Sequence, residues 1–395
     1  MFPGVHMSVS RSVSLLCALS AALVACGDVP DGSDSSSDAE LKDLKITGLS
    51  KEESDQHDRG DKLFSKVYRE SEGLGPVFIE ASCESCHAQD TKGPGAVTRM
   101  VITTADNVTA ALDQSALPYG DVARPSFTSL LTKGVEIPPA NTPRLKTSRR
   151  IGPAVLGRGW MEAVDPLVID KLAQAQSGEI EHGRVPRLKD GRLGRFGLKA
   201  RVATLLDFAG DASRGDMGLT SPSFPFETDN PLGLKDDEKS GLDLAATDIA
   251  DLAFYTLTLK IPERKTTTGK GASLFDTVRC ARCHVPTLMT SSSFRIPQMA
   301  GKPAPIYSDM LLHDMGTELA DGIVEGGARE REWRTAPLIG IRFMSSFLHD
   351  GRARTLDDAI KMHGGSGSEA NLSVSNYNAL STQDKKTLTD FVSNL

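Results

Sequence analysis

Two stretches of the chain carry hydrophobic residues at helical spacing, and each closes one half of the sequence. Residues 247–259 (TDIADLAFYTLTL) and 382–395 (TQDKKTLTDFVSNL) have apolar side chains three and four positions apart, behind a threonine and acidic residues typical of a helix start. In the second stretch Leu388, Phe391 and Val392 share one face. Both stretches are therefore predicted to be amphipathic helices packed on a core.

A shorter pattern opens each half. Residues 60–67 (GDKLFSKV) and 271–278 (GASLFDTV) place Gly, Leu-Phe and Val at the same spacing, which indicates an entry helix in a duplicated unit. Residues 262–271 (PERKTTTGKG) read as a linker between the halves. Between residues 90 and 235 the periodicity is poor, and frequent Gly and Pro predict short helices, loops and a small hairpin. Such loops are candidates for the walls of an active site.

The amino terminus has the features of an export signal. Arg11 precedes an apolar run that is too short to cross a bilayer as a mature helix. The run ends in LVAC, which resembles a bacterial lipobox. Residues 1–25 are therefore predicted to be a lipoprotein signal peptide, with Cys26 as the lipid-modified first residue of the mature protein. An ordinary signal peptide with a coincidental cysteine is the alternative.

The segment after the signal is polar. Residues 26–56 begin as GDVPDGSDSSSDAE after Cys26 and contain too little apolar surface to fold, so we expect a disordered tether. Gly27 rather than Asp follows Cys26, which argues against retention in the inner membrane. We therefore expect a lipid-anchored protein of the outer membrane, with its folded part in the periplasm or at the cell surface.

The overall composition narrows the classes of partner. The 395-residue chain has a formal net charge of −7, which is not the basic balance of a nucleic-acid-binding protein. No further apolar stretch is long enough for a second membrane anchor.

Four of the six cysteines lie in two copies of the motif Cys-x-x-Cys-His, at residues 83–87 (CESCH) and 280–284 (CARCH). This is the attachment motif of c-type heme, in which two thiols bind the vinyl groups and the histidine becomes an axial iron ligand. We therefore predict two covalently bound hemes c, held by Cys83, Cys86, His87, Cys280, Cys283 and His284. A thioredoxin-like pair needs no following histidine. Zinc-binding pairs usually lie about 15–20 residues apart, and disulfides would leave both histidines unexplained.

The heme motifs and the duplicated helices together predict a mainly α protein with two cytochrome c-like helical domains. The first is expected at residues 57–262, with a large loop-rich insertion, and the second at residues 263–395.

A sixth iron ligand is predicted for the second heme. Residues 355–365 (TLDDAIKMHGG) form a short helix with a capping box at its start and a glycine pair at its end. His363 lies on the apolar face of this helix, so we predict that it binds the iron of the His284 heme. A buried histidine bonded to a backbone carbonyl is the alternative. Three other residues remain possible ligands: His313, His349 and Met315.

Further candidate residues rest on weaker signals. Arg334 is a candidate partner of a heme propionate, although a surface arginine fits the sequence equally well. Trp333 and Trp160 are candidates for packing on a heme or for carrying an electron. The sequence is equally compatible with both being ordinary core residues. Candidate catalytic proton carriers are Glu162, His182 and Glu80, against the simpler reading of solvated side chains.

A series of motifs resembles a known family. In order they are GLGPVFIEASCESCHAQD, GRGWMEAV, GRFGLKA, GDMGLTSPSFP, CARCHVPT, YSDMLLHDMGTELADG, EWRTAPLIG and FLHDGRARTLDDAIKMHGG. They resemble the di-heme oxidoreductase family of peroxidases, which is related to bacterial di-heme cytochrome c peroxidases, the MauG enzymes and di-heme rubber oxygenases. The resemblance covers nearly all of the chain after residue 57.

The resemblance implies a division of roles between the hemes. In these relatives the second heme transfers electrons, with a distal ligand from the position of His363, and peroxide or oxygen reacts at the first heme. The peroxidases carry Met at that position, so His363 resembles the bis-histidine arrangement of the rubber oxygenases. Family members often have Trp where this chain has Leu198, which removes any role for an aromatic side chain there.

The expected function is a peroxidase-like oxidoreductase. It would reduce peroxide, or oxidise an organic substrate, at the first heme. Electrons would come through the second heme from a small periplasmic donor of the cytochrome c or cupredoxin type. The alternatives are a non-enzymatic electron-transfer lipoprotein and an oxygenase-type di-heme enzyme. The large insertion favours an enzyme, since an electron carrier needs no elaborate pocket.

Overall fold

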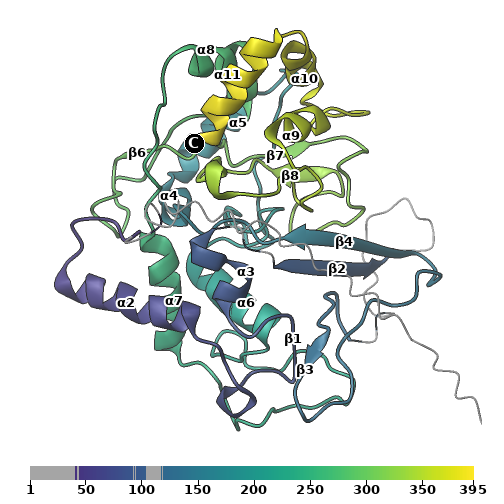
Figure 1. Cartoon of the computed structure of the whole chain (residues 1–395). Coiled ribbons are helices and arrows are strands. Elements are labelled where there is room, and N and C mark those ends of the chain that lie inside the picture. Colours follow the sequence, from purple (N-terminus) through teal and green to yellow (C-terminus); the bar gives the residue numbers. More distant parts are fainter. Residues whose placement is uncertain (1–40, 42–43, 92, 94, 104–116, 118) are drawn as a thin grey trace, which may run out of the picture.

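The computed structural model describes residues 41, 44–91, 93, 95–103, 117 and 119–395 (Figure 1). The predicted signal peptide and Cys26 lie outside the described residues. Within them the fold is mostly helical. The α-helices are α2 (Lys51–Ser65), α3 (Cys83–Cys86), α4 (Arg158–Ala163), α5 (Pro166–Ala175), α6 (Leu205–Met217), α7 (Ala246–Thr258), α8 (Lys270–Thr277), α9 (Leu356–Met362), α10 (Asn371–Asn378) and α11 (Thr382–Ser393). Short 3₁₀ turns cover Glu70–Glu72, Ala88–Asp90, Cys280–Arg282 and Ile341–Phe343.

The strands are few and short, as a mainly α fold implies. They are β1 (Val77–Phe78), β2 (Ala96–Ile102), β3 (Ser126–Phe127), β4 (Leu145–Ile151), β5 (Leu288–Met289), β6 (Pro303–Ala304), β7 (Leu312–Asp314) and β8 (Glu332–Arg334). They pair as four antiparallel two-stranded sheets, β1 with β3, β2 with β4, β5 with β6 and β7 with β8. The β2–β4 ribbon, with seven residue pairs, is the hairpin-like element expected in the insertion.

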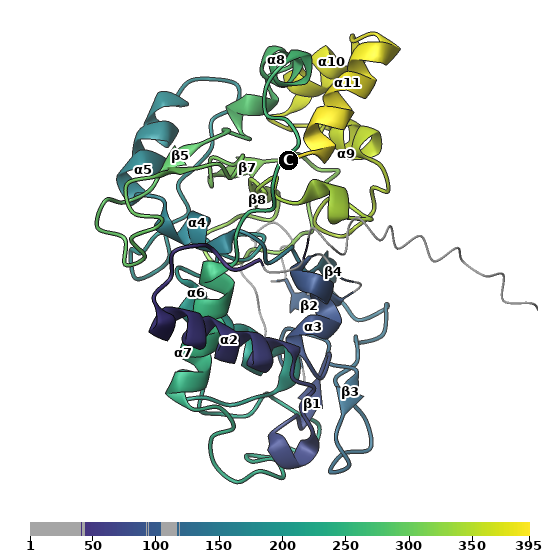
Figure 2. The ribbon, with the colours of Figure 1, turned by 60° about the vertical axis from the view of Figure 1, so that its left-hand side comes forward.

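The first helical group is built on the crossing of α2 and α7 (Figure 2). Ser50 caps α2 by accepting a hydrogen bond from the Glu53 amide, and the Glu53 carboxylate accepts one from the Ser50 amide. A Cβ atom on Gly60 would overlap the carbonyl oxygen of Asp251 in α7. The repeated glycine of the entry motif is therefore the point at which the two backbones touch.

The second helical group repeats this contact. A Cβ atom on Gly271 of α8 would overlap Phe391 of α11, so the second copy of the glycine also lies at a helix crossing. Around it Phe275, Leu388 and Val392 are buried in one apolar cluster. The predicted entry and closing helices are confirmed in both halves, as α2 with α7 and α8 with α11.

The segment of chain between the two helical groups does not pack only against the first group. In Figures 1 and 2, α5 lies in the upper part of the molecule with the second half of the chain, and Figure 2 shows it next to β5. Val164 forms a bridge with Thr290, and Arg184 forms one with Leu312. The predicted division at residue 262 thus remains a prediction, and residues from about 158 to 203 contact the second half of the chain.

A network of buried charges joins the insertion to the second half. Arg150 of β4 pairs with Asp321 at 2.6 Å and also with Glu325. Lys199, which is fully buried, pairs with Asp321 at 2.9 Å. Because removing one partner would leave an uncompensated buried charge, these pairs fix the relative position of the segments they join.

The ordered part of the chain begins before residue 57. Leu44 and Ile46 are buried, and the Ile46 amide donates a 2.9 Å hydrogen bond to the Thr258 carbonyl at the end of α7. Residues 44–56, which were predicted to belong to the tether, are therefore part of the folded core, because apolar residues among them pack on α7. In the described part of the chain, no helix has both the length and the hydrophobicity of a membrane span.

Candidate functional site

The first Cys-x-x-Cys-His motif forms the floor of a cavity. Ser82 caps α3 by accepting a hydrogen bond from the Ser85 amide at 3.1 Å. Cys83, Cys86 and His87 line a cavity of about 940 Å³ of empty space, including its open mouth. Burial raises the pKa of each thiol to about 12. Both thiols are free, so they are available to form thioether bonds to a group held in the cavity.

His87 is held as a neutral imidazole. Burial, with a smaller contribution from the nearby Arg158 charge, lowers its pKa to about 4. Its Nδ1 is buried with no hydrogen-bond partner among the described residues. A Cβ atom on Gly152 would lie 2.9 Å from the ring, so the glycine leaves room for it. A neutral imidazole is the form that binds a metal.

Two buried guanidinium groups line the same cavity. Arg158 donates to the Ala154 carbonyl at 2.6 Å, and Arg334 donates to the Thr335 carbonyl at 2.7 Å. Among the described residues neither has a carboxylate partner. Burial lowers the pKa of Arg158 to about 9 and that of Arg334 to about 10. Unpaired buried cations need an anionic partner, and heme carries two carboxylates, so the cavity fits a heme c attached to its two thiols.

One face of α6 forms a wall of the cavity. Ala209, Ala212, Ser213 and Asp216, at helical positions i, i+3, i+4 and i+7, all line it. The first three are small and leave space. Burial raises the pKa of Asp216 to about 6, and the negative charge of Asp211 adds to the effect.

The other lining residues complete the picture of this site. Glu80, one of the sequence candidates, also lines the cavity. Met217 does as well, but of the described histidines only His87 does. The cavity therefore combines one imidazole, a wall of small side chains and a carboxyl group that can exchange a proton near neutral pH.

Glu162 and His182 do not line this cavity. The Glu162 carboxylate accepts a 2.6 Å hydrogen bond from the Leu205 amide at the start of α6 and pairs with Arg295 at 3.2 Å. The His182 side chain is 60% exposed, and its Nδ1 lies 3.0 Å from the Ile180 carbonyl oxygen. Glu162 thus accepts a hydrogen bond at the start of a helix, and His182 is a surface residue. The geometry gives no support to the catalytic roles predicted for them.

Two histidines face each other at the second motif. His284 follows the Cys280–Arg282 turn, and its Nδ1 lies 3.0 Å from the Tyr307 carbonyl oxygen. His363 ends α9, and its Nδ1 lies 2.6 Å from the Ala359 carbonyl oxygen. Each Nδ1–H therefore donates to a backbone carbonyl and leaves Nε2 with a lone pair. Burial lowers the pKa of both imidazoles, that of His284 to about 4.

The spacing of these two rings fits an iron between them. Their centroids are 6.5 Å apart and their planes differ by 62°. A metal–nitrogen distance of about 2.0 Å on each side, with about 1.1 Å from nitrogen to ring centre, would separate the centroids by about 6.2 Å. The hydrogen bond of His363 to a backbone carbonyl, which the sequence offered as an alternative to ligation, is thus present and compatible with it, because it uses the other nitrogen.

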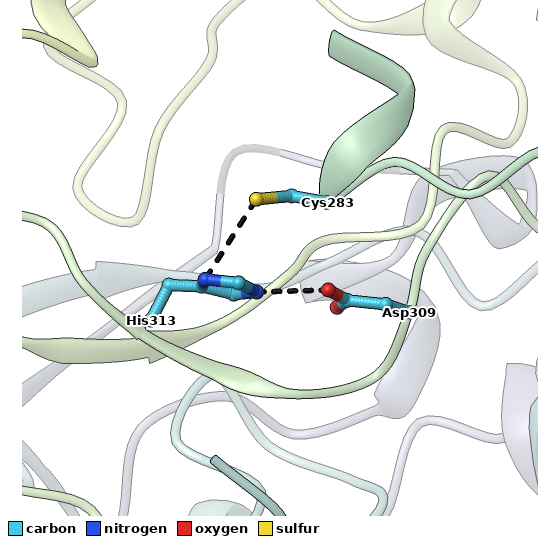
Figure 3. A group of neighbouring side chains, drawn as sticks. All are labelled: Cys283, Asp309 and His313. Atoms are coloured by element: carbon cyan, nitrogen blue, oxygen red, sulfur yellow. Dashed lines mark hydrogen bonds and ion pairs between the residues drawn. The ribbon is translucent and has the colours of Figure 1, made fainter. Parts of the chain in front are cut away.

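His313 lies beside this motif but has both nitrogens occupied. Its Nε2 is 2.8 Å from Asp309 and its Nδ1 is 2.7 Å from Glu369, with the Cys283 sulfur 3.7 Å from Nδ1 (Figure 3). Burial acts to lower the pKa of His313, but the adjacent Asp309 carboxylate outweighs it and raises the pKa well above its usual value. An imidazolium held by two carboxylates has no lone pair for iron, and Cys283 belongs to the heme motif. This cluster therefore supports the second site without being a separate metal site.

The remaining candidate residues from the sequence make packing and backbone contacts. His349 stacks on Trp333 with centroids 4.0 Å apart, and the Trp333 indole donates to the Leu319 carbonyl at 2.9 Å. The Lys199 ammonium lies 4.5 Å from the centroid of the same ring. Met315 forms a backbone bridge with Ser368. Trp160 is partly buried against the largest apolar cluster.

Asp216 and Arg158 are the residues of this site that the sequence motifs did not single out. Both lie inside quoted motifs, GDMGLTSPSFP and GRGWMEAV, and the only available signal for Asp216 was its place on the small-residue face of a helix.

One comparison with known proteins, the match to a family model, agrees with this chemistry. Residues 144–395, which are 252 of the 395 residues, match the family described as "Di-haem oxidoreductase, putative peroxidase". Hydrazine synthase from Kuenenia stuttgartiensis is similar in structure, with 14% identity, 100% of this chain and 99% of that chain covered, and a TM-score of 0.40. A MauG-like protein associated with microbial copper homeostasis has 15% identity, 88% and 89% coverage, and a TM-score of 0.37. A search of curated proteins gave no match.

Proposed function

Since the chain belongs to the di-heme oxidoreductase family, we propose that it is a peroxidase whose first heme, at His87, binds and reduces peroxide while its second heme, at His284, supplies electrons. The observation that carries the proposal is the asymmetry of the two sites. The His87 cavity contains one histidine and a wall of small side chains, whereas His284 faces a second imidazole at a spacing that suits one iron.

The overall reaction requires two electrons and two protons. One molecule of hydrogen peroxide takes up both and yields two molecules of water. When bound, the hemes supply the electrons and the site at which the O–O bond breaks. The chain supplies proton transfer, orientation and charge balance.

Asp216 is the residue that we assign to proton transfer. Its carboxyl lines the cavity and has a pKa raised to about 6 by burial, so it takes up and returns a proton near neutral pH. In this role it would accept the proton of the oxygen that binds and return it to the oxygen that leaves. Glu80 lines the same cavity and is the second carboxyl in reach of this role.

The two guanidinium groups have a positioning role. Arg158 comes from α4 and Arg334 from β8, and both are buried at the cavity without a carboxylate partner among the described residues. Pairing with the heme carboxylates would remove two uncompensated charges and fix the tilt of the ring.

His363 sets the role of the second heme. If His284 and His363 both hold the second heme, that heme would have a lower potential than one held by a histidine–methionine pair, because a thioether favours the reduced metal. That makes the His284 heme a good donor to the first heme. The immediate source of electrons would be a small soluble donor of the cytochrome c or cupredoxin type.

We also propose that the protein is held at the outer membrane through a lipid on Cys26, with the folded part in the periplasm or at the cell surface. The support for this location is the lipobox-like LVAC sequence.

Carbon monoxide titration tests the asymmetry. The dithionite-reduced protein should bind one molecule of carbon monoxide per two hemes, and the fully reduced protein should be oxidised by two electrons per hydrogen peroxide. Mass spectrometry of the same sample should give the mature polypeptide plus two hemes. Binding of no carbon monoxide, together with slow oxidation by peroxide, would instead support an electron-transfer protein with both irons closed.

An oxygenase-type enzyme is the second candidate, because the histidine at position 363 resembles the bis-histidine arrangement of the di-heme rubber oxygenases. It is distinguished by oxygen consumption with an organic substrate in the absence of peroxide.

A further inference from the structure

Three acidic side chains converge in the loop that joins α6 to α7, away from both heme motifs. Each of Glu227, Asp237 and Asp243 offers a carboxylate oxygen, and these oxygens all lie within 4.8 Å of one another. Glu227 is 9% exposed and Asp243 is 7% exposed, while Asp237 is partly buried. Three carboxylates at this spacing repel one another strongly unless a cation lies between them.

The protein leaves one oxygen of each carboxylate without a donor. Glu227 Oε2, Asp237 Oδ2 and Asp243 Oδ1 are buried and have no hydrogen-bond partner among the described residues. The second oxygen of Asp243 accepts from the amide and the hydroxyl of Thr220, both at 2.7 Å. The second oxygen of Asp237 accepts from the Lys239 amide at 2.7 Å. These bonds fix the carboxylates of Asp237 and Asp243 in place beside Glu227, while one oxygen of each of the three groups is left without a donor.

No described cation neutralises the cluster. None of the three carboxylates forms a salt bridge with a described residue. The nearest ammonium, that of Lys239, donates instead to the backbone carbonyl of Asp243 at 2.5 Å. Burial raises the pKa of Glu227 to about 8 and that of Asp237 to about 6, with the neighbouring carboxylates adding to both shifts. The described residues therefore supply no direct cation partner to the cluster, although the Arg214 and Lys239 charges partly offset the rise in the pKa values of Glu227 and Asp237.

We propose that Glu227, Asp237 and Asp243 bind a calcium ion. Calcium prefers oxygen ligands at 2.3–2.6 Å, so two ligand oxygens on opposite sides of the ion lie about 4.6–5.2 Å apart. Three carboxylate oxygens within 4.8 Å of one another can therefore share one ion. The donors are hard oxygen atoms, with no histidine or cysteine in the cluster, which disfavours zinc and copper. Magnesium binds at 2.0–2.1 Å and demands a tighter octahedron.

The ion would tie the loop to the end of the helix that walls the His87 cavity. Asp243 lies three residues before α7, and its bond to Thr220 reaches back to the third residue after α6. Arg214 of α6 donates to the Glu227 carbonyl at 2.8 Å. Calcium would therefore hold both ends of this loop, and through them the carboxyl-terminal end of α6.

The test is calcium binding to the purified holoprotein after treatment with EGTA, measured by isothermal titration calorimetry and by terbium luminescence. We expect one site per chain with a Kd of about 10⁻⁴ M or lower, and an increase in the melting temperature of about 3–6 °C at a hundredfold excess over Kd. Magnesium at the same concentration should give a much smaller shift. Failure to bind calcium at millimolar concentration would overturn the proposal.

Two variants separate a metal site from a structural acidic cluster. Glu227→Gln should weaken calcium binding by at least about 30-fold. Above pH 8, where the Glu227 carboxyl of the calcium-free wild type is ionised, the calcium-free variant should melt at a higher temperature than the calcium-free wild type, because one repulsive charge is gone. Asp243→Asn should weaken binding similarly. Asp236→Asn, an exposed neighbour in the same loop, is the matched control and should bind as the wild type does. Equal calcium binding by Glu227→Gln and by the control would also refute the assignment. Because these readouts do not involve peroxide, they are independent of the proposed activity.

Discussion

The assignment of proton transfer to Asp216 makes a prediction that can be developed quantitatively. Asp216→Asn replaces the carboxyl with an amide of the same shape on the α6 wall. Since no salt bridge of Asp216 to a described residue is lost, the change should leave the fold intact. An amide does not take up a proton, so the step that moves the peroxide proton loses its base.

The size of the effect follows from the position of the group. A positioned general acid–base group contributes about 10²- to 10⁴-fold to a rate, so we expect kcat/KM for hydrogen peroxide to fall by at least about 100-fold. With a pKa of about 6, Asp216 is about one-tenth ionised at pH 5 and about nine-tenths ionised at pH 7. The wild-type rate should therefore rise as the pH increases through 6, and this rise should be absent in Asp216→Asn.

The assay is steady-state peroxide reduction with a reduced electron donor, from pH 4.5 to 8.5, on protein whose mass shows two attached hemes. Asp207→Asn is the matched control, because Asp207 lies on the same helix but pairs with Arg192 at 2.7 Å outside the cavity. It should keep the wild-type rate and pH profile. If kcat/KM of Asp216→Asn stays within threefold of the wild-type value and still rises with pH near 6, the role of Asp216 is refuted. Glu80 would then be the candidate for proton transfer.

Three further predictions follow. His363→Gly should raise the carbon monoxide stoichiometry of the reduced protein from one to two per chain, and His363→Met should raise the potential of the His284 heme; unchanged values in both variants would return His363 to a purely structural role. Cys26→Ser should move the protein from the membrane fraction to the soluble fraction, and continued membrane association would place the anchor elsewhere. Trp333→Phe should leave electron transfer between the hemes within about twofold, because two cations close to the Trp333 ring, Lys199 at 4.5 Å and Arg150 at 5.5 Å, disfavour its oxidation. The same variant should lower the free energy of unfolding by about 1–3 kcal/mol in chemical denaturation; a large loss of electron transfer would identify Trp333 as a relay.

Local patterns predicted the parts of this fold that depend on neighbouring residues. The spacing of Leu388, Phe391 and Val392 predicted α11, and the capping pattern before His363 predicted α9. The repeated glycine proved to have one physical reason in both halves, since Gly60 and Gly271 each lie where two helices touch. Heme attachment could likewise be predicted without a structure, because each motif contains the two thiols and the histidine within five consecutive residues.

Contacts between residues far apart along the chain could not be predicted from the sequence. Nothing in the order of residues indicated that Arg334, from the second half, would lie with Arg158 at the His87 cavity. Asp216 looked like any acidic residue of a polar helix until burial at the cavity distinguished it. Conversely, Glu162 stood in a promising motif, but its carboxylate serves the start of α6. Burial and partners decide these roles, and neither is a property of a single residue.

The position of Arg334 at the first cavity has a consequence for how the protein matures. A chain cut after residue 262 would contain CESCH but would lack one of the two guanidinium groups at that cavity, along with the second-half residues that contact residues 158–203. The first heme pocket is therefore completed only after the second half of the polypeptide has been synthesised and folded. Heme attachment at Cys83 and Cys86 would precede that closure, while the thiols are still accessible. An isolated amino-terminal half would hold its heme in a pocket that lacks the Arg334 guanidinium.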